Sequence, residues 1–165
     1  MQKVNHIQGK WRNVVFLLVA LLIVVADQLS KVWIRSNLAT GQSLPETGFF
    51  QLTHVQNSGG AFGLFQGQSF PLTILASIVI AILLFYVFFI SHRFPFLDNM
   101  PGKAVLGLVL GGAIGNLIDR LRFGYVTDFI DVGIWPAFNI ADSAVTVGVI
   151  IIAYFLLSLA RAEEG

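Results

Sequence analysis

Four long apolar segments constrain this chain more than any other feature of its sequence. Each holds about 20 mostly apolar residues, the length of helix that crosses a hydrocarbon core of about 30 Å. Hydrophobic residues make up 56% of the 165 residues and charged residues 12%, which is too little charge to cover a soluble globule of this size. We therefore predict an all-α integral membrane protein with transmembrane helices over residues 14–34, 70–90, 102–122 and 141–160.

The positions of the basic residues predict the orientation of these helices. Loops 37–69 and 124–136 contain no Lys or Arg. Because basic residues concentrate in cytoplasmic segments, we expect both termini to be cytoplasmic. A cleaved signal peptide is the alternative for the first segment, but residues 27–31 lack a small-x-small cleavage pattern. The basic residues that flank the cytoplasmic side in this arrangement are Lys3, Lys10, Arg12, Arg93, Lys103 and Arg161.

The loop between the first two segments predicts a small extracytoplasmic β-hairpin or sheet. Residues 49–55 are rich in β-forming side chains, and a turn signal follows at residues 57–60. Residues 123–132, between the last two segments, are expected to form one or two short turns. No internal repeat or interdomain linker is visible, so we expect one membrane-embedded domain over residues 1–165.

Composition and motif spacing exclude several other functions. The net charge of +1 and the scattered Lys and Arg residues argue against nucleic-acid binding. The absence of cysteine excludes disulfides and thiolate chemistry. His6, His54 and His92 lie too far apart for an HExxH-type zinc motif, so no metal site is predicted.

Asp128 and Asp142 interrupt apolar sequence and are the main functional candidates. An acid near the bilayer is costly unless it is paired or functional, and these two lie 14 residues apart across a short reversal of the chain. Two carboxyls held together outside water share one proton. The ionised carboxyl then activates water, while the protonated one hydrogen-bonds to the scissile carbonyl. This is aspartic-peptidase chemistry, which needs no metal or cofactor.

Both acids also have a structural interpretation. Asn139 and Asp142 have the spacing of a helix N-cap and the acid three residues later. Asp128, like its neighbour Asp131, is also compatible with an inert loop acid. Spacing alone does not separate these two loop acids.

Polar residues on the first and third helices are predicted to pair. Asp27 and Lys31 are spaced for an ion pair within one helix. Asn116, Asp119 and Arg120 share one helix face, where Asp119 is expected to offset the charge of Arg120. Arg120 and Asn116 are also candidates to orient a substrate or hold an acid in place. Glycines that recur every four residues predict close approach of another helix; they are Gly107, Gly111 and Gly115.

Five polar motifs follow one another along almost the whole chain. They are Asp27-Gln28-Leu29-Ser30-Lys31, Asn57-Ser58-Gly59-Gly60-Ala61-Phe62-Gly63, Asn116-Leu117-Ile118-Asp119-Arg120, Val126-Thr127-Asp128-Phe129 and Phe138-Asn139-Ile140-Ala141-Asp142-Ser143. In this order and spacing they resemble the motifs of the bacterial lipoprotein signal peptidases, or type II signal peptidases. The resemblance implies that Asp128 and Asp142 form a catalytic pair, and that Asp27 and Asp119 are mainly structural. It implies supporting roles for Asn57, Asn116, Arg120 and Asn139.

The resemblance also implies a reaction and a location. The expected enzyme is an intramembrane aspartic endopeptidase that removes signal peptides from diacylglyceryl-modified prolipoproteins, cutting just before the lipidated cysteine. It would lie in the bacterial cytoplasmic (inner) membrane among membrane lipid, with its active site toward the extracytoplasmic face. A monomer that is inhibited by globomycin-like peptides is expected. The alternatives are a small proton- or ion-coupled membrane carrier and a non-enzymatic adaptor, neither of which explains acids clustered at one membrane face.

Overall fold

The computed structural model describes residues 2–59, 69–93 and 97–163. Within these residues, four helices are long and apolar enough to cross a membrane, which confirms the four predicted spans. Of the five polar motifs, the one that begins at Asn57 is described only as far as residue 59, and its residues 60–63 lie outside the described part of the chain. The helices are α1 (Gln2–Asn37), α2 (Ser69–Phe85), α3 (Met100–Phe123) and α4 (Ile140–Glu163), with a π-helical turn η2 (Tyr86–Ile90) and a 3-10 turn η3 (Ser91–Arg93) after α2.

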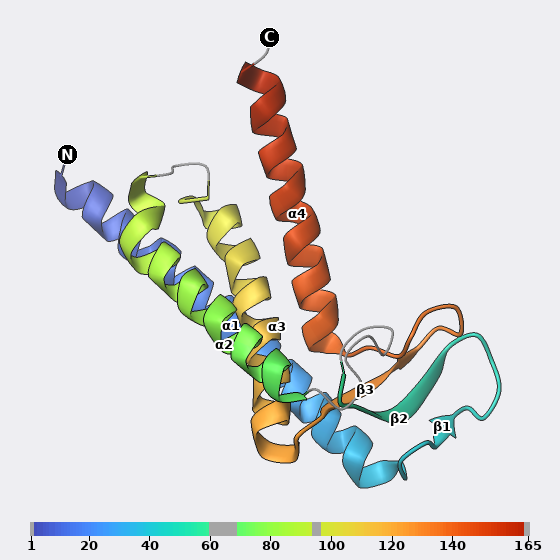
Figure 1. Cartoon of the computed structure of the whole chain (residues 1–165). Coiled ribbons are helices and arrows are strands. Elements are labelled where there is room, and N and C mark those ends of the chain that lie inside the picture. The colour runs from blue at the N-terminus through green and yellow to red at the C-terminus, as the bar shows by residue number, and fades with distance from the viewer. Residues whose placement is uncertain (1, 60–68, 94–96, 164–165) are drawn as a thin grey trace.

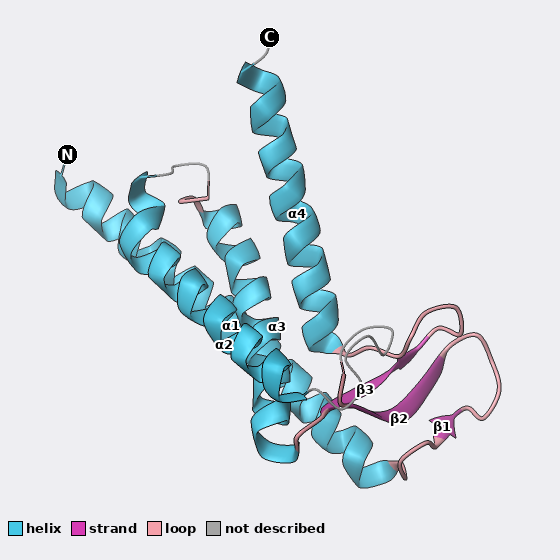
Figure 2. Ribbon diagram, in the orientation of Figure 1, coloured by secondary structure: helices cyan, strands magenta, loops and turns pink. Residues whose placement is uncertain are grey.

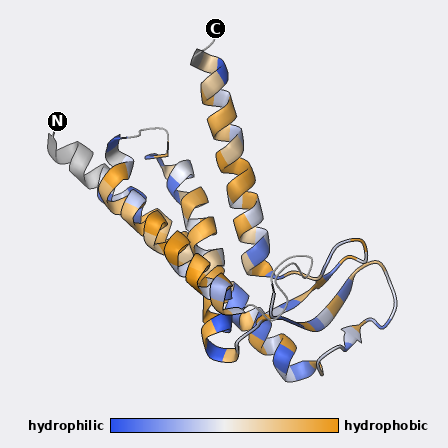
Figure 3. Ribbon diagram, viewed as in Figure 1, coloured by the Kyte–Doolittle hydropathy of each residue, from blue (hydrophilic) through white to orange (hydrophobic). Residues whose placement is uncertain are grey.

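The helices form a bundle with a small sheet at one end. Figure 1 shows the start of α1 and the end of α4 at the end of the bundle opposite the sheet. In Figure 3 the middle parts of the helices are mainly hydrophobic, and hydrophilic residues gather near the sheet. This distribution is the one that a membrane-spanning bundle requires, because lipid offers no partners for polar groups.

α3 lies at the centre of the bundle and packs closely on its neighbours through glycine. A Cβ added at Gly107 would lie 2.7 Å from the carbonyl oxygen of Phe16, and one at Gly111 would lie 2.7 Å from that of Ala20. The face of α3 toward α1 therefore has no room for larger side chains, which confirms the predicted close approach. Gly112 meets α4 in the same way on the adjacent face.

The sheet has three antiparallel strands in the order β1 (Ser43–Leu44), β2 (Gln51–Asn57) and β3 (Val126–Asp131), as Figure 2 shows. The first two confirm the predicted sheet between the first two spans. The prediction of short turns at 123–132 was wrong, because that segment supplies β3. Its β-branched and aromatic residues suit a strand, and β2 offers an edge with which to pair.

A bulge in β2 sets the register near Asp128. Leu52 pairs with Ile130 and Val55 pairs with Asp128, so β2 has one more residue than β3 between these pairs. The extra residue explains why the adjacent Thr53 and His54 are both buried. Beyond the bulge, Asn57 lies two residues past the partner of Asp128 and on the same face of the sheet, where diagonal neighbours are within reach of each other.

At the end of the bundle opposite the sheet, an ion-pair cluster joins three helical segments. Arg12 of α1 and Lys103 of α3 contact the Asp98 carboxylate at 3.0 and 3.3 Å. Lys103 is fully buried and also donates to Ser91 Oγ at 2.7 Å. This cluster is separate from the acids near the sheet.

Candidate active site

The N-terminus of α4 fixes the position of Asp142. The backbone N–H of Asp142 donates to Asn139 Oδ1 at 2.9 Å, and the backbone N–H of Asn139 donates to Asp142 Oδ2 at 3.3 Å. These reciprocal bonds are a capping box, which confirms the predicted N-cap role of Asn139. Asp142 therefore lies in the first turn of α4, where the helix dipole favours a negative charge.

The chain brings Asn139 back to β3 just before α4 begins. The backbone of Phe138 accepts from the N–H of Ile130 at 2.7 Å and donates to its carbonyl at 3.0 Å. This bridge places the next residue, Asn139, beside the middle of β3. Its Nδ2 donates to Asp128 Oδ1 at 2.7 Å.

Asp128 is buried in the middle of β3 with amide donors on both carboxylate oxygens. Asp128 is only 2% exposed, so its interpretation as an inert loop acid is wrong. Asn57 Nδ2 donates to Oδ2 at 2.8 Å, while Asn139 occupies Oδ1. Asp131, in contrast, accepts from the backbone N–H of Gly133 in the turn after β3.

Asparagine side chains link the two acids. Asn116 Nδ2, on α3, donates to Asp142 Oδ1 at 2.7 Å. Asn139 Nδ2 donates to Asn116 Oδ1 at 3.1 Å as well as to Asp128. Asp128 and Asp142 therefore share one hydrogen-bonded network through Asn139 and Asn116.

The environment of Asp128 favours its protonated form. Burial raises the pKa of Asp128 from 3.8 to about 7, and the negative charge of Asp142 acts in the same direction. Hydrogen bonds from Asn57 and Asn139 and the positive charge of Lys31 oppose the rise in this pKa. The pair is thus able to retain a proton near neutral pH.

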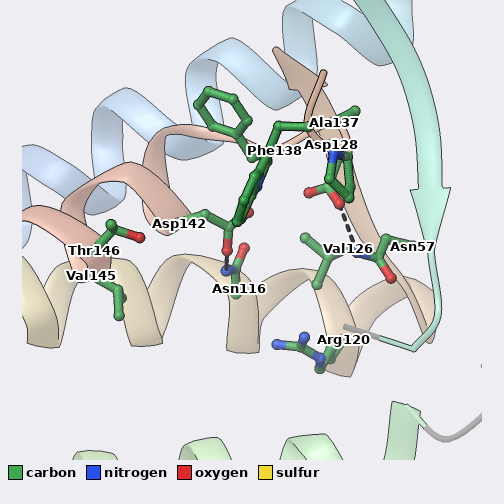
Figure 4. Close-up of a pocket in the computed structure, with 12 residues that line it drawn as sticks. Asn57, Asn116, Arg120, Val126, Asp128, Ala137, Phe138, Asp142, Val145 and Thr146 are labelled. Carbon is green, nitrogen blue, oxygen red and sulfur yellow. Dashed lines mark hydrogen bonds between the residues drawn. The ribbon is translucent and has the colours of Figure 1, made fainter. Parts of the chain in front are cut away.

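Both acids line a cavity of about 320 Å³. Figure 4 shows the hydrogen bonds of Asn57 to Asp128 and of Asn116 to Asp142 beside this cavity. A second, more apolar cavity of about 340 Å³ shares Trp135, Phe138, Asp142 and Thr146 with the first. The first cavity is lined by Asn57, Asn116, Arg120, Val126, Asp128, Trp135, Pro136, Ala137, Phe138, Asp142, Val145 and Thr146.

A buried ion-pair network supports the site from α1 and α3. Lys31 Nζ lies 2.8 Å from Asp27 Oδ2, which confirms the predicted pair. Asp119 contacts Lys31 and Arg35, each at 3.5 Å. Asp119 makes these ion pairs and none with Arg120 in the described ranges, because α3 turns Asp119 toward α1 and Arg120 toward the cavity. The expected offset of the Arg120 charge by Asp119 is therefore limited to an interaction through space.

The same network holds β3 in place. Asp119 Oδ2 accepts from the backbone N–H of Thr127 at 2.9 Å, and Arg35 donates to Thr127 Oγ1 at 2.9 Å. Gln28 donates to Asp27, to the Gly115 carbonyl and to Asp119. No role was predicted for Gln28, Arg35 or Thr127, although Arg35 lies one helical turn beyond Lys31 on the same face.

Arg120 is the cation nearest the cavity. Its guanidinium makes no hydrogen bond or ion pair with another residue in the described ranges, although it lines the cavity with both acids. Asp142, Asp128 and Asp119 are the negative charges that act on it. It is therefore able to donate to a bound molecule.

The structure brings the predicted polar residues together at one end of the bundle, whereas Asp131 does not line the cavity. The residues brought together are Asp27, Lys31, Asn57, Asn116, Asp119, Arg120, Asp128, Asn139 and Asp142. Across residues 2–59, 69–93 and 97–163, no group of three or more His, Asp or Glu side chains is arranged to hold a metal ion. The polar groups that line the cavity include the carboxyls of Asp128 and Asp142 and the guanidinium of Arg120.

Fold and site together define a multi-pass membrane protein with two buried carboxyls linked at one cavity, an arrangement suited to acid–base hydrolysis. Residues 19–158 match the sequence profile of signal peptidase (SPase) II. The chain belongs to the signal peptidase II family, and this membership identifies it as an aspartic protease.

Known proteins support this assignment over most of the chain. A lipoprotein signal peptidase from Dehalococcoides mccartyi is 55% identical over 139 residues, covering 84% of this chain and 86% of the relative. One from Moorella thermoacetica is 48% identical over 154 residues, covering 91% and 97%. A bacterial membrane enzyme solved by the in meso method at 2.3 Å resolution superposes with a TM-score of 0.76 at 33% identity and covers 87% of each chain.

Proposed function

We propose that this protein is an endopeptidase that removes the signal peptide from diacylglyceryl-modified prolipoproteins, with Asp128 and Asp142 as its catalytic pair. The observation that carries the proposal is that Asn139 and Asn116 link both carboxyls at one cavity. The names of the relatives support the substrate class, because they are lipoprotein signal peptidases.

The pair works with one shared proton. The ionised carboxyl takes a proton from a water molecule as the water oxygen attacks the scissile carbonyl carbon. The protonated carboxyl donates a hydrogen bond to the carbonyl oxygen and stabilises the tetrahedral intermediate. The C–N bond then breaks, and the proton taken from water passes to the leaving nitrogen, so the pair returns to its starting state.

The supporting side chains have separate tasks in this mechanism. Asn57 and Asn139 hold Asp128, and Asn116 holds Asp142, in orientations that leave room for substrate. Arg120 donates to the substrate backbone from the cavity wall. Asp27, Lys31 and Asp119 hold α1, α3, β3 and the start of α4 together.

We place the protein in the bacterial cytoplasmic membrane as a single-domain monomer with both termini in the cytoplasm. The loops that carry the site contain no Lys or Arg, which supports an extracytoplasmic site. A scissile bond just before a lipid-anchored cysteine would lie at the same interface, with the lipid against the apolar helices. Globomycin-like peptides are then expected to compete for the cavity.

A cleavage assay with purified protein tests substrate and mechanism together. The parent protein should process a lipid-modified prolipoprotein in liposomes and leave the unmodified form intact. Asp128→Asn and Asp142→Asn should each lower kcat by about 10³-fold or more while the protein still folds. Asp131→Asn is the matched control and should remain within about twofold of the parent.

Two outcomes contradict the proposal. Retained cleavage in either Asn variant removes that residue from the catalytic pair. Absence of cleavage by the parent, together with pH-driven solute uptake into the same liposomes, favours a carrier instead.

A further inference from the structure

Lys31 is a fully buried cation that is connected to Asp142 through the side chain of Asn116. Its Nζ is 2.8 Å from Asp27 Oδ2 and donates a hydrogen bond of 2.9 Å to Asn116 Oδ1. The carboxylate of Asp119 is farther away, at 3.5 Å. Pairing with Asp27 accounts for the burial of the charge, whereas the bond to Asn116 connects Lys31 to the cavity.

The bond from Lys31 determines which way the Asn116 amide faces. An ammonium group only donates, so it binds the amide oxygen and leaves the NH2 group to face the other way. There Nδ2 donates to Asp142 Oδ1 at 2.7 Å. Asn139 donates to the same Asn116 oxygen and to Asp128, so each acid is connected to Lys31 through asparagine.

The charges around this network balance when the acid pair keeps one proton. Asp27 and Asp119 offset Lys31 and Arg35, and Arg120 offsets one ionised carboxyl of the pair. Removing Lys31 leaves a net negative charge, which opposes ionisation of the pair. The charged groups that face the network are Asp27, Lys31 and Arg35 on α1, Asp119 and Arg120 on α3, Asp128 on β3 and Asp142 on α4.

We propose that Lys31 is a positioning residue for peptide hydrolysis, which holds the Asn116 amide toward Asp142 and supplies the positive charge that keeps one carboxyl of the pair ionised. This role is additional to the structural pairing with Asp27. It rests on the proposed function of Asp128 and Asp142.

The pH profile of cleavage by Lys31→Gln tests this role. The substitution removes the charge and shortens the side chain by one atom, which weakens its hold on the Asn116 amide, so kcat should fall about tenfold or more. The acidic limb of the kcat/KM profile should move to higher pH by about one unit, because the carboxyl that must ionise has lost a nearby cation.

Asp27→Asn separates charge from structural pairing. It breaks the same ion pair but keeps the positive charge of Lys31. In the parent, the N–H of Ala141 donates to Asp27 Oδ1 at 3.0 Å, and the amide oxygen of Asn can accept this bond in the variant. The acidic limb should move to lower pH, since a negative charge near the pair is lost. Opposite shifts in the two variants distinguish a charge effect from simple loss of the ion pair.

Lys103→Gln is the matched control. Lys103 is also fully buried and contacts a carboxylate, Asp98, at 3.3 Å, but it lies at the other end of the bundle. This variant should lower the melting temperature by an amount similar to that of Lys31→Gln and leave the pH profile unchanged.

A folded Lys31→Gln protein whose pH profile superimposes on that of the parent overturns the proposal. If that variant does not fold, an acidic limb that stays in place or moves to higher pH in Asp27→Asn overturns it. Infrared titration of the protonated carboxyl band, assigned by its loss in Asp128→Asn, gives a readout independent of activity. Absence of prolipoprotein cleavage by the parent would refute the proposed function, while this titration would still report whether Lys31 controls ionisation of the pair.

Discussion

The side-chain amide of Asn139 donates to Asp128 at 2.7 Å, from the residue that also caps the helix carrying the second acid. Replacing Asn139 with Ser keeps an N-cap oxygen but removes the amide donor. We expect Asn139→Ser to lower kcat more than tenfold, because Asp128 and Asn116 each lose a hydrogen bond. The measurement is the cleavage rate at saturating substrate.

Asn139→Ala is the companion to this variant, because it removes both the amide and the cap. It should be as inactive as Asn139→Ser but less stable by about 1 kcal/mol, the usual contribution of an N-cap. Full activity in Asn139→Ser would mean that catalysis depends on the N-cap oxygen and not on the hydrogen bond from the Asn139 amide to Asp128.

The raised pKa of Asp128 predicts a stability that falls as pH rises. The folded protein binds this proton up to about pH 7, whereas the unfolded chain releases it near pH 3.8. Stability from this group is therefore complete below pH 3.8 and is lost between pH 3.8 and about 7. At 1.36 kcal/mol for each pH unit, the loss is at most about 4 kcal/mol.

The check is the melting temperature in detergent across this pH range. In Asp128→Asn the side chain does not titrate, so its stability relative to the parent should increase steadily up to about pH 7 and then level off. Parallel melting curves for the two proteins across the range would contradict the raised pKa.

Close packing between α1 and α3 predicts that Gly111→Ala destabilises the bundle. An added Cβ would lie 2.7 Å from both the Ala20 carbonyl oxygen and Ile23 Cβ. Overpacking of this kind costs about 1–3 kcal/mol, which should lower the melting temperature by several degrees. The control is Gly9→Ala, where the nearest heavy atom to the added Cβ is Arg12 Nη2 at 3.7 Å; its melting temperature should not fall.

Trp135 lines both cavities and should contribute to substrate binding more than to catalysis. We expect Trp135→Ala to raise KM about tenfold and to change kcat by less than about threefold, since contacts made equally in ground and transition states affect KM. Ile134→Ala is the neighbouring control, because Ile134 is 85% exposed and lines neither cavity. A fall in kcat alone for Trp135→Ala would contradict a binding role.

The four spans were predictable because length and apolarity are local properties of the chain. The predicted limits of 14–34 were too short for the first span, which runs from Gly9 to Asn37. Lys31 lies inside the predicted limits, and Arg35 lies directly beyond them. They are tolerated within the helix because α3 and β3 supply partners for them.

β3 was missed because its pairing is not local. The bond from Asn57 to Asp128 joins residues 71 positions apart, and nothing within residues 123–132 reveals the edge of β2. Spacing within one helix predicted the Asp27–Lys31 pair and the Asn139 cap, but contacts between distant elements were not predictable. The partners of Asp119, for example, depend on how α3 is rotated against α1, which the glycine contacts determine.

Because the capping box at Asn139 fixes Asp142 at the start of α4, the acid pair forms only after α4 has joined the bundle. Asp142 lies in the first turn of the last helix, and its amide donor Asn116 lies on the helix before it. A chain that has not yet inserted α4 therefore has Asp128 but no second carboxyl beside it. On the proposed mechanism, hydrolysis would therefore begin only after α4 has inserted, and a chain without α4 would leave neighbouring peptides in the membrane uncut.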